Sequence, residues 1–567
     1  MSGLDWVVLF TTLLIIVIYG VYKSRGTDNM DGFLLGNKSF PWYYVTLSVM
    51  ATQASAITFL SAPGLAFSSG MAFVQFYFGL PLAMIVLCIT FVPIFHRLNI
   101  YTAYEFLESR FDLKTRALTA FLFLIQRGLS TGISIYAASI ILSTVLNINT
   151  TFTTIFIGSV VILYTVYGGT KAVSYTQLLQ MSVIFSGLFI AGVVVVKLLP
   201  ETVGFGKALQ IAGKMGRTNA IDFTFDWNNQ YTVWSGLIGG FFLQLSYFGT
   251  DQSQVGRYLT GSSIGQSRLG LLMNGLVKIP MQFLILLIGV LVFAFYQYHQ
   301  PPIFFNRYEL SKLEKSQYAP ELTRIKSDYT EAFKNKQIEV DRLEAALDAN
   351  DEKAINSQRV LLQAADERTK AIRKEAMDLM IKNDPNADTN DNNYVFLSFV
   401  TKYLPQGLIG LLIAIVFLAS MGSTAGALNS LASTTVIDIY KRLINTGDSD
   451  EQYLSVSRWS TIIWGIFCLL MALYASKMGN LIEAVNILGS LFYGTILGIF
   501  VVAFYLKKIG GSATFWAAII TEVIVFACWK ANIMAFLWLN VVGCLLVMII
   551  AQIIQLVNGN RPKVLST

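Results

Sequence analysis

Two hydroxyl side chains, Ser423 and Thr424, occur inside a long apolar segment of the sequence without a charged residue beside them. A small hard cation such as Na⁺ prefers oxygen ligands, so these hydroxyls and freed backbone carbonyls could together form its site. Serine and threonine hydroxyls also bond back to their own helix, so the segment alone is compatible with a purely structural role.

A second segment that could supply free carbonyls runs from Leu47 to Gly64. Small and polar residues fill its middle, and Pro63 stands near its end. Such a helix can break at mid-membrane and expose carbonyl oxygens, although the same small residues also permit close helix packing. A third segment, beginning near residue 231, breaks at Gly249-Thr250-Asp251. Interrupted segments at these two places are expected of an inverted-repeat transporter.

Other polar side chains also lie in apolar segments. Lys278 needs a partner, a hydrated cavity or a neutral state, so we interpret it as a gating or structural residue. Asn486 is a candidate substrate-facing amide or a hydrogen-bonding group between helices. Gln126 and Arg127 stand near the start of a helix, which favours a side chain that reaches the membrane interface. We interpret Glu522 as close to a helix end, which disfavours a proton-driven carrier.

The composition indicates that these residues are positioned by helices within a membrane. Hydrophobic residues make up 54% of the 567 residues and charged residues 13%, where a soluble protein has about a quarter charged residues. This excludes a large soluble enzyme and a disordered chain. The four cysteines lie far apart in apolar runs and the two histidines stand alone, so no metal centre or disulfide framework is expected. The apolar segments also lack the clustered carboxylates or histidines of an enzyme.

We therefore predict an all-α integral membrane protein that is not an enzyme. Thirteen segments are long enough to cross a ~30 Å hydrocarbon core, with helices 1–8 within residues 1–300 and helices 9–13 within 393–556. Lysine and arginine gather in alternate connections. The positive-inside rule then places the N-terminus outside and the tail 557–567 in the cytoplasm. The expected location is a plasma membrane, that of a bacterium.

Residues 301–392 form a charged insertion with 15 basic and 18 acidic residues. Its apolar residues recur at helical spacing, which predicts two amphipathic helices outside the membrane, in a hairpin. The simplest interpretation is a solvated insertion without a role in the core mechanism. A surface for an unknown partner is the alternative. Because the insertion is acidic, the net charge of +7 comes from the membrane body and indicates topology, not nucleic-acid binding.

Several motifs together resemble the sodium:solute symporter family over roughly residues 1–300 and 393–510. They are Tyr101-Thr102-Ala103-Tyr104-Glu105, Tyr167-Gly168-Gly169, Asp251-Gln252-Ser253-Gln254 with Arg257, and Ser423-Thr424 with Asp438-Ile439-Tyr440-Lys441. The third motif is closer to the monocarboxylate, vitamin and iodide branch than to the sugar branch. The resemblance implies a LeuT-like fold with one extra N-terminal helix and two C-terminal helices. Its first repeat spans about 41–198 and its inverted second repeat begins at about 231.

The resemblance also implies a sodium site between helices 2 and 9. Its ligands are the carbonyls of Ala51, Ala54 and Ala419 and the hydroxyl of Ser423. The family usually has two adjacent hydroxyls, but this sequence has Gly422 at the first, so either Thr424 or a water substitutes. Gln177 stands where many members carry an aspartate. Because an uncharged amide cannot balance a second Na⁺, we expect one sodium ion per cycle.

The solute is expected to bind near the same helices. Sugar-carrying members have glutamine and glutamate where this sequence has Thr58 and Tyr77, although Lys278 and Asn486 match polar positions of the sugar carriers. We favour Na⁺-coupled symport of a small organic anion, such as a monocarboxylate, over a hexose or sialate-type sugar. A transporter-like solute sensor is the alternative of another class. The residues expected near the solute are Gln53, Thr58, Tyr77, Asp251 and Asn486.

Overall fold

The computed structural model describes residues 1–24, 38–98, 100–445, 447 and 449–558, and the regular elements among them are helices. Within these ranges, the side chains at 17, 20–24, 164, 167–176, 178 and 450 are outside the description. Extended pairing in the described residues is confined to one isolated bridge between Phe40 and Gly261. Most of the predicted tail 557–567 and the side chains of the Tyr167 motif fall outside the described part.

The helices follow one another along the chain. Before the insertion they are α1 (Gly3–Ser24), α3 (Trp42–Gln53), α4 (Ala56–Ser69), α5 (Leu80–Val86), α6 (Val92–Leu98), α7 (Glu105–Arg110), α8 (Leu113–Leu146), α9 (Thr150–Lys197), α10 (Phe205–Lys214), α11 (Gly240–Thr250), α12 (Gln252–Tyr258) and α13 (Ile264–Tyr298). From the insertion onward they are α14 (Arg307–Glu314), α15 (Ala319–Asp348), α16 (Glu352–Asn383), α17 (Val395–Tyr403), α18 (Leu408–Thr434), α19 (Asp450–Tyr474), α20 (Leu481–Tyr505), α21 (Gly511–Lys530) and α22 (Phe536–Asn558).

Among the described residues, nine helices are long and apolar enough to cross a membrane, and the bent pair α3 and α4 makes up to ten. Two shorter apolar helical stretches, Gly3–Ile16 and Thr150–Leu163, add to these. The segments predicted at 152–168 and 174–198 join without a loop in the single helix α9. The residues between these two segments include no proline, so the backbone hydrogen bonds of the helix can continue through them. That thirteen segments cross the membrane stays a prediction.

Two of the apolar segments are interrupted inside the bundle. α3 and α4 are bent by 63° across Ala54 and Ser55. The interruption therefore lies before Pro63, which is contained within α4. α11 ends at Thr250 and α12 begins at Gln252, with Asp251 between them in an extended conformation. The carboxylate of Asp251 accepts a hydrogen bond from the amide of Ser253 and so caps α12.

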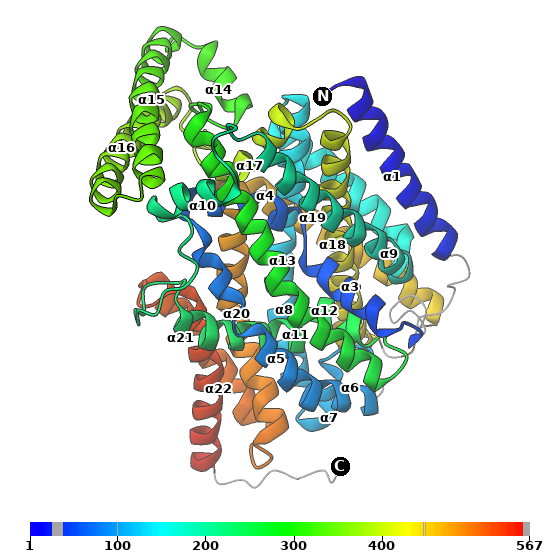
Figure 1. Ribbon diagram of the computed structural model, residues 1–567. Helices are drawn as coiled ribbons and strands as arrows, with labels where there is room; N and C mark the ends of the chain where they lie inside the picture. Colours follow the sequence, from blue (N-terminus) through cyan, green and yellow to red (C-terminus); the bar gives the residue numbers. More distant parts are fainter. Residues whose placement is uncertain (25–37, 99, 446, 448, 559–567) are drawn as a thin grey trace.

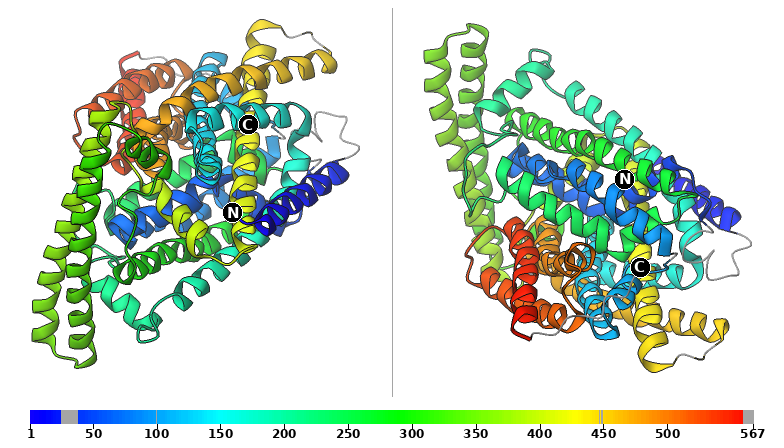
Figure 2. Two further views of the ribbon diagram at one scale, coloured as in Figure 1. Left: turned by 90° about the horizontal axis from the view of Figure 1, so that it is seen from above. Right: turned by 90° about the horizontal axis from the view of Figure 1, so that it is seen from below.

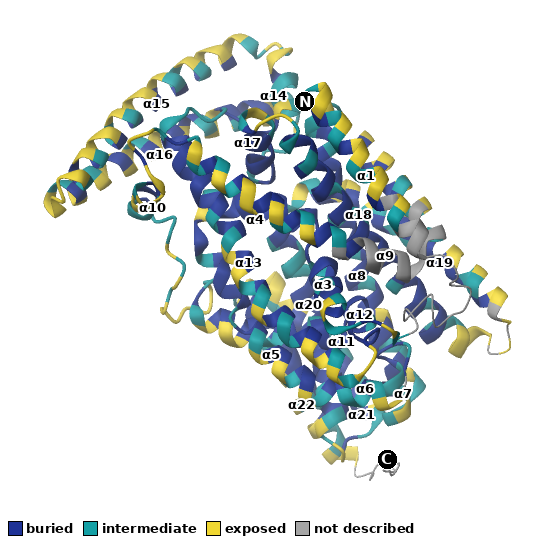
Figure 3. Cartoon of the chain, turned by 45° about the vertical axis from the view of Figure 1, so that its right-hand side comes forward, coloured by how far each residue is buried: buried dark blue, intermediate teal, exposed yellow. Residues whose placement is uncertain are grey.

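α18 lies at the centre of the bundle and is buried along nearly its whole length (Figure 3). It packs against α1, α8 and α9. Asp5 of α1 binds the N-terminal end of α18. One of its carboxylate oxygens accepts hydrogen bonds from the backbone amides of Gly407 at 2.6 Å and Gly410 at 3.4 Å. A carboxylate at a helix N-terminus is stabilised by the unpaired amides and by the helix dipole. This contact fixes the position of the helix that carries Ser423 and Thr424.

Beside the bundle, α15 and α16 form an antiparallel hairpin that lies along one edge of the molecule (Figure 2). Figure 1 places this hairpin and the N-terminal end of α1 toward one end of the bundle, and the C-terminal end of α22 toward the other. A separate apolar cluster, which includes Leu322, Tyr329 and Leu379, joins the hairpin helices. Lys207 of α10 forms ion pairs with Glu344 and Asp348, which attach the hairpin to α10.

Candidate functional site

The break between α3 and α4 frees two carbonyl groups. In a continuous helix the amide of Ser55 would donate to the carbonyl of Ala51, and the amide of Thr58 would donate to that of Ala54. Here the amide of Ser55 donates to Gln53 at 3.2 Å, and the amide of Thr58 donates to Ser55 at 3.0 Å. The carbonyls of Ala51 and Ala54 are thereby released from the helical pattern. Both were predicted as sodium ligands.

α18 contributes hydroxyl oxygens to the region beside this break, because it packs against both α3 and α4. Ser423 and Thr424 line the same cavity as the broken helix. The Ser423 hydroxyl donates to the carbonyl of Ser420 at 3.1 Å, which leaves its oxygen able to accept or to ligate. The Thr424 hydroxyl oxygen is buried and has no hydrogen-bond partner in the described structure. Ala419 is buried one turn before Ser423.

Gln180 of α9 lies close to the place of the missing first hydroxyl. A Cβ atom built on Gly422 would lie 3.1 Å from Oε1 of Gln180, and the Gln180 side chain is buried. An amide oxygen is a suitable ligand for a hard cation, so Gln180 is a candidate that sequence reasoning missed. Gln177 accepts a hydrogen bond from the Ser48 hydroxyl at 2.9 Å and lies 3.5 Å from the Thr52 hydroxyl. Gln177 therefore connects α9 to α3.

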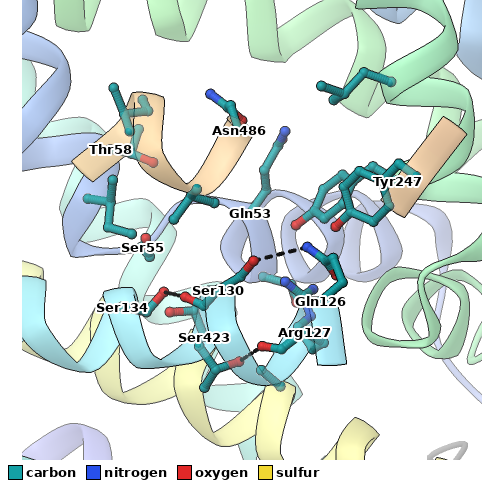
Figure 4. Close-up of a pocket in the computed structure, with 18 of the residues that line it drawn as sticks. Gln53, Ser55, Thr58, Gln126, Arg127, Ser130, Ser134, Tyr247, Ser423 and Asn486 are labelled. Carbon is teal, nitrogen blue, oxygen red and sulfur yellow. Dashed lines mark hydrogen bonds between the residues drawn. The ribbon is translucent and has the colours of Figure 1, made fainter. Parts of the chain in front are cut away.

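A polar cavity, which we call the solute cavity, opens beside the break (Figure 4). Its empty volume is about 870 Å³, counting space that opens to solvent. Four of the five residues predicted near the solute line it: Gln53, Thr58, Tyr77 and Asn486. In Figure 4, Gln53, Thr58 and Asn486 surround its upper part, and Gln126 and Arg127 of α8 lie below.

The fifth predicted residue, Asp251, lies behind the wall of the solute cavity. Its carboxylate forms an ion pair with Arg127, with 3.3 Å between Nη2 and Oδ1. It also accepts hydrogen bonds from the Tyr493 hydroxyl at 2.9 Å and the Ser253 hydroxyl at 2.6 Å. Arg127 and Tyr493 line the cavity themselves. Asp251 therefore supports the groups that face a solute.

The interpretation of Arg127 as an interface-seeking side chain is wrong. Arg127 is buried on α8, its guanidinium lies 5.7 Å from the centre of the Tyr247 ring, and it also donates to the Ser253 hydroxyl. Its Nε is buried and has no hydrogen-bond partner in the described structure. The ion pair with Asp251 makes this burial possible. A buried guanidinium at the wall of a cavity is suited to bind a carboxylate.

Neutral hydrogen-bonding groups complete the solute cavity. The amide of Gln126 donates to the Ser130 hydroxyl at 3.0 Å. Both amide atoms of Gln244 and the Oε1 of Gln53 are buried without a partner in the described structure. A buried polar atom without a partner costs free energy unless a ligand or water satisfies it. The wall can therefore bind a polar solute through several hydrogen bonds in addition to one ion pair.

Two other polar residues do not line the solute cavity. Lys278 is fully buried on α13, and its Nζ lies 5.7 Å from the centre of the Tyr77 ring and has no hydrogen-bond partner in the described structure. It therefore contacts the cavity wall from behind. Glu522 lies in the middle of α21 with both carboxyl oxygens buried, so its interpretation as a residue near a helix end is wrong. Glu522 does not line the solute cavity.

An all-helical bundle of apolar helices, with one helix broken at a polar internal cavity, is the architecture of a secondary transporter. The sequence model of the sodium:solute symporter family matches residues 33–308 and 379–521, and the chain belongs to this family. Membership makes sodium the coupling ion and places the chain among multi-pass membrane transporters.

Several characterised relatives are similar over long stretches. The sodium-coupled monocarboxylate transporter 1 of Xenopus laevis is 26% identical over 499 residues, which cover 88% of this chain and 67% of the relative. The sodium/sialic acid symporter SiaT of Proteus mirabilis is 24% identical over 558 residues, 97% of this chain and 94% of that protein. The human sodium/iodide cotransporter is 31% identical over 274 residues, 48% of this chain and 42% of that protein.

The fold is also that of a solved transporter. A Na⁺-coupled sialic acid symporter in a substrate-bound, outward-open state aligns with a TM-score of 0.75 and 21% sequence identity. The alignment covers 98% of both chains. The two proteins therefore share their helical architecture.

Proposed function

We propose that this protein is a Na⁺ symporter for a small organic solute that carries a carboxylate. The observation that carries the proposal is the buried guanidinium of Arg127, which lines the same cavity as Ser423, Thr424 and the broken helix. A guanidinium and a carboxylate form the strongest class of charge-assisted hydrogen bond. Both the monocarboxylate and the sialic acid relatives are named for acids, which fits this chemistry.

We propose that sodium binds between the α3–α4 break and α18. Its ligands are the freed carbonyls of Ala51 and Ala54, the carbonyl of Ala419 and the hydroxyls of Ser423 and Thr424, with the amide oxygen of Gln180 beside Gly422 as a further ligand. All of these ligands are neutral oxygens, which suits one monovalent cation. Because Gln177 supplies no charge for a second cation and is bonded to α3, one Na⁺ is transported per solute.

In this mechanism, Na⁺ binding joins the broken helix to α18 and stabilises the state that accepts solute. Ser423 and Thr424 line both the sodium region and the solute cavity, so one ion can organise the cavity that the solute enters. The two helix repeats, about 41–198 and from about 231, then rock against each other and open the cavity to the opposite side. The coupling free energy comes from the differential affinity of the two states for Na⁺ and for the solute, and is about 1–3 kcal/mol.

A sialate-type sugar acid is the second candidate solute. The amides of Gln53, Gln244 and Asn486 line the solute cavity and can bond to sugar hydroxyls, while Arg127 binds the carboxylate. A hexose has no carboxylate that could bind Arg127, which disfavours a hexose as the solute. A solute sensor with the same cavity is the alternative of another class. Transport of the bound solute distinguishes the carrier from the sensor.

We propose that the protein spans a plasma membrane with the N-terminus outside, the hairpin of residues 301–392 outside and residues 557–567 in the cytoplasm. The hairpin and the N-terminal end of α1 lie toward the same end of the bundle in Figure 1, in agreement with this orientation. Lys441 and Arg442 follow α18 at its other end. Positive residues favour the cytoplasmic side.

A thermal-shift measurement on the purified protein tests the proposed solute class. A ligand that binds the folded state stabilises it, and the melting temperature rises with the logarithm of the ligand concentration once that exceeds Kd. We expect lactate or N-acetylneuraminate to raise it in NaCl and much less in KCl, with lactamide, the uncharged analogue of lactate, inactive. Equal shifts by lactate and lactamide, or equal shifts in the two salts, would reject a Na⁺-linked carboxylate site.

A further inference from the structure

A second polar cavity, which we call the exit cavity, lies between α12 and the second half of α18. Its empty volume is about 360 Å³, again counting space that opens to solvent. Its lining residues are Tyr101, Gln252, Ser253, Gly256, Arg257, Gly426, Asn429, Ser430 and Ser433. None of these residues lines the solute cavity, so the two cavities are distinct.

The exit cavity follows the solute cavity along α18. The solute cavity uses Ser423, Thr424 and Ala427 of this helix, whereas the exit cavity uses Gly426, Asn429, Ser430 and Ser433. At a rise of 1.5 Å per residue, the second group lies roughly 7 Å further along the helix. This direction leads to Lys441 and Arg442, at the end of the helix assigned above to the cytoplasm.

The side chains of the exit cavity are suited to an anion. Arg257 is 3% exposed, and its Nη2 lies against Gly426, where a Cβ atom would come within 2.6 Å of it. The Nδ2 group of Asn429, itself 7% exposed, is a buried donor without a hydrogen-bond partner in the described structure. The residues that line the cavity include one cation and no carboxylate. A buried cation beside a donor that lacks an acceptor favours an oxyanion ligand.

The boundary between the two cavities is short and polar. Ser253 lines the exit cavity, and its hydroxyl accepts a hydrogen bond from Arg127, which lines the solute cavity. The same hydroxyl donates to Asp251 at 2.6 Å. Arg257 follows Ser253 by one turn of α12. Ser253 therefore contacts one buried guanidinium, that of Arg127, and lines the exit cavity together with a second, that of Arg257.

We propose that the exit cavity is a second binding site for the carboxylate of the transported solute, occupied as the solute leaves toward the cytoplasm. This inference rests on the proposed function. If no second cation followed Arg127 along the path, an anion that leaves Arg127 would cross a low-dielectric region at a large desolvation cost. Arg257 and Asn429 lower that cost because they replace the hydrogen bonds that the carboxylate loses at Arg127.

Solute affinity measured separately from the two sides of the membrane tests this site. Right-side-out vesicles expose the outer face, and inverted membrane vesicles expose the cytoplasmic face. We expect Arg257→Gln and Asn429→Ala each to raise the half-saturating concentration of labelled lactate or N-acetylneuraminate about tenfold from the cytoplasmic face, because a charge-assisted or buried hydrogen bond is lost. From the outer face the change should be less than about twofold. Ser159→Ala, an exposed serine of α9, is the matched control.

The outcomes separate the inference from the proposed function. Arg257→Lys retains the positive charge and should keep most of the affinity for the solute at the cytoplasmic face. If the guanidinium had only a structural role, a lysine would not preserve this affinity. If Arg257→Gln fails to assemble, Asn429→Ala carries the same expectation. An equal change from both faces, or no change from the cytoplasmic face, would overturn the exit site while transport persists. Absence of Na⁺-dependent carboxylate transport in the unmodified protein would instead overturn the proposed function and this inference with it.

Discussion

The guanidinium of Arg127 on α8 lies 3.3 Å from the carboxylate of Asp251, the residue at which α11 gives way to α12. This ion pair joins α8, in the first predicted repeat, to the junction of α11 and α12, in the second, at the wall of the solute cavity. Asp251 is in turn held by Tyr493 and Ser253. The guanidinium of Arg127 is therefore held in one position at the cavity wall. A site for an anionic solute requires such a preorganised cation.

Arg127→Gln should raise the half-saturating concentration of a carboxylate solute more than about tenfold, because the charge-assisted hydrogen bonds are lost. The single substitution also leaves Asp251 as an unpaired buried charge, at a cost of about 3–5 kcal/mol. The double variant Arg127→Gln with Asp251→Asn removes both charges and should regain thermal stability without regaining affinity. Recovery of carboxylate affinity in the double variant would show that Arg127 acts only through the fold.

Ser423→Ala should raise the half-saturating Na⁺ concentration for uptake about tenfold, since one oxygen ligand is lost, and Thr424→Val should act in the same direction. Ser420→Ala is the matched control on the same helix, because the Ser420 hydroxyl donates to the carbonyl of Ser134 and does not line the solute cavity. Initial uptake rates across a series of Na⁺ concentrations give the result. Unchanged sodium dependence in both variants would reject the α18 site.

One Na⁺ and one monovalent carboxylate carry no net charge across the membrane together. The structure has the neutral Gln177 hydrogen-bonded to Ser48, where many members of the family carry an aspartate. We therefore expect accumulation at equilibrium to follow the first power of the Na⁺ gradient and to be insensitive to an imposed K⁺ diffusion potential. Accumulation with the square of the gradient, together with an inward current, would indicate two sodium ions.

Asp388, between α16 and α17, predicts a pH dependence of stability. Its carboxylate is half-buried and accepts a hydrogen bond from the Tyr136 hydroxyl at 3.3 Å. Removal from water raises the pKa of Asp388 to about 7. The folded state then holds this proton more tightly than the unfolded state, so its contribution to stability falls as the pH rises from about 4 to about 7. Asp388→Asn should flatten this part of a melting-temperature profile and raise the melting temperature at pH 8.

The hairpin contains a buried ion pair, Lys336 with Asp366, at 2.7 Å and with side chains 7% and 8% exposed. Lys336→Met leaves a buried carboxylate with one fewer partner and should destabilise the hairpin by about 3 kcal/mol. Arg324→Ala breaks the exposed pair with Asp328 and should cost less than about 1 kcal/mol. Hydrogen exchange of amides in α15 and α16 measures both effects. Faster exchange after Arg324→Ala than after Lys336→Met would contradict this assignment.

Local sequence patterns predicted the helical bundle, the insertion and the two interrupted segments. These features depend on apolar runs and clusters of small residues that extend over only a few helical turns. They did not place the first break at Ala54–Ser55, because Pro63 is the more conspicuous residue and it lies within α4. Arg127 was misinterpreted because its partner Asp251 lies far along the chain. Gln180 was missed for the same reason, since its position beside Gly422 depends on the packing of α9 against α18.

The central claim is that one protein couples the entry of Na⁺ to that of a carboxylate solute. Purified protein in liposomes, supplied with labelled lactate or N-acetylneuraminate, tests it directly. An inward Na⁺ gradient should drive accumulation of at least one of the two acids above its external concentration, and Arg127→Gln and Ser423→Ala should each reduce this uptake. Uptake of neither acid above that of protein-free liposomes, or uptake unaffected when K⁺ replaces Na⁺, would contradict the account.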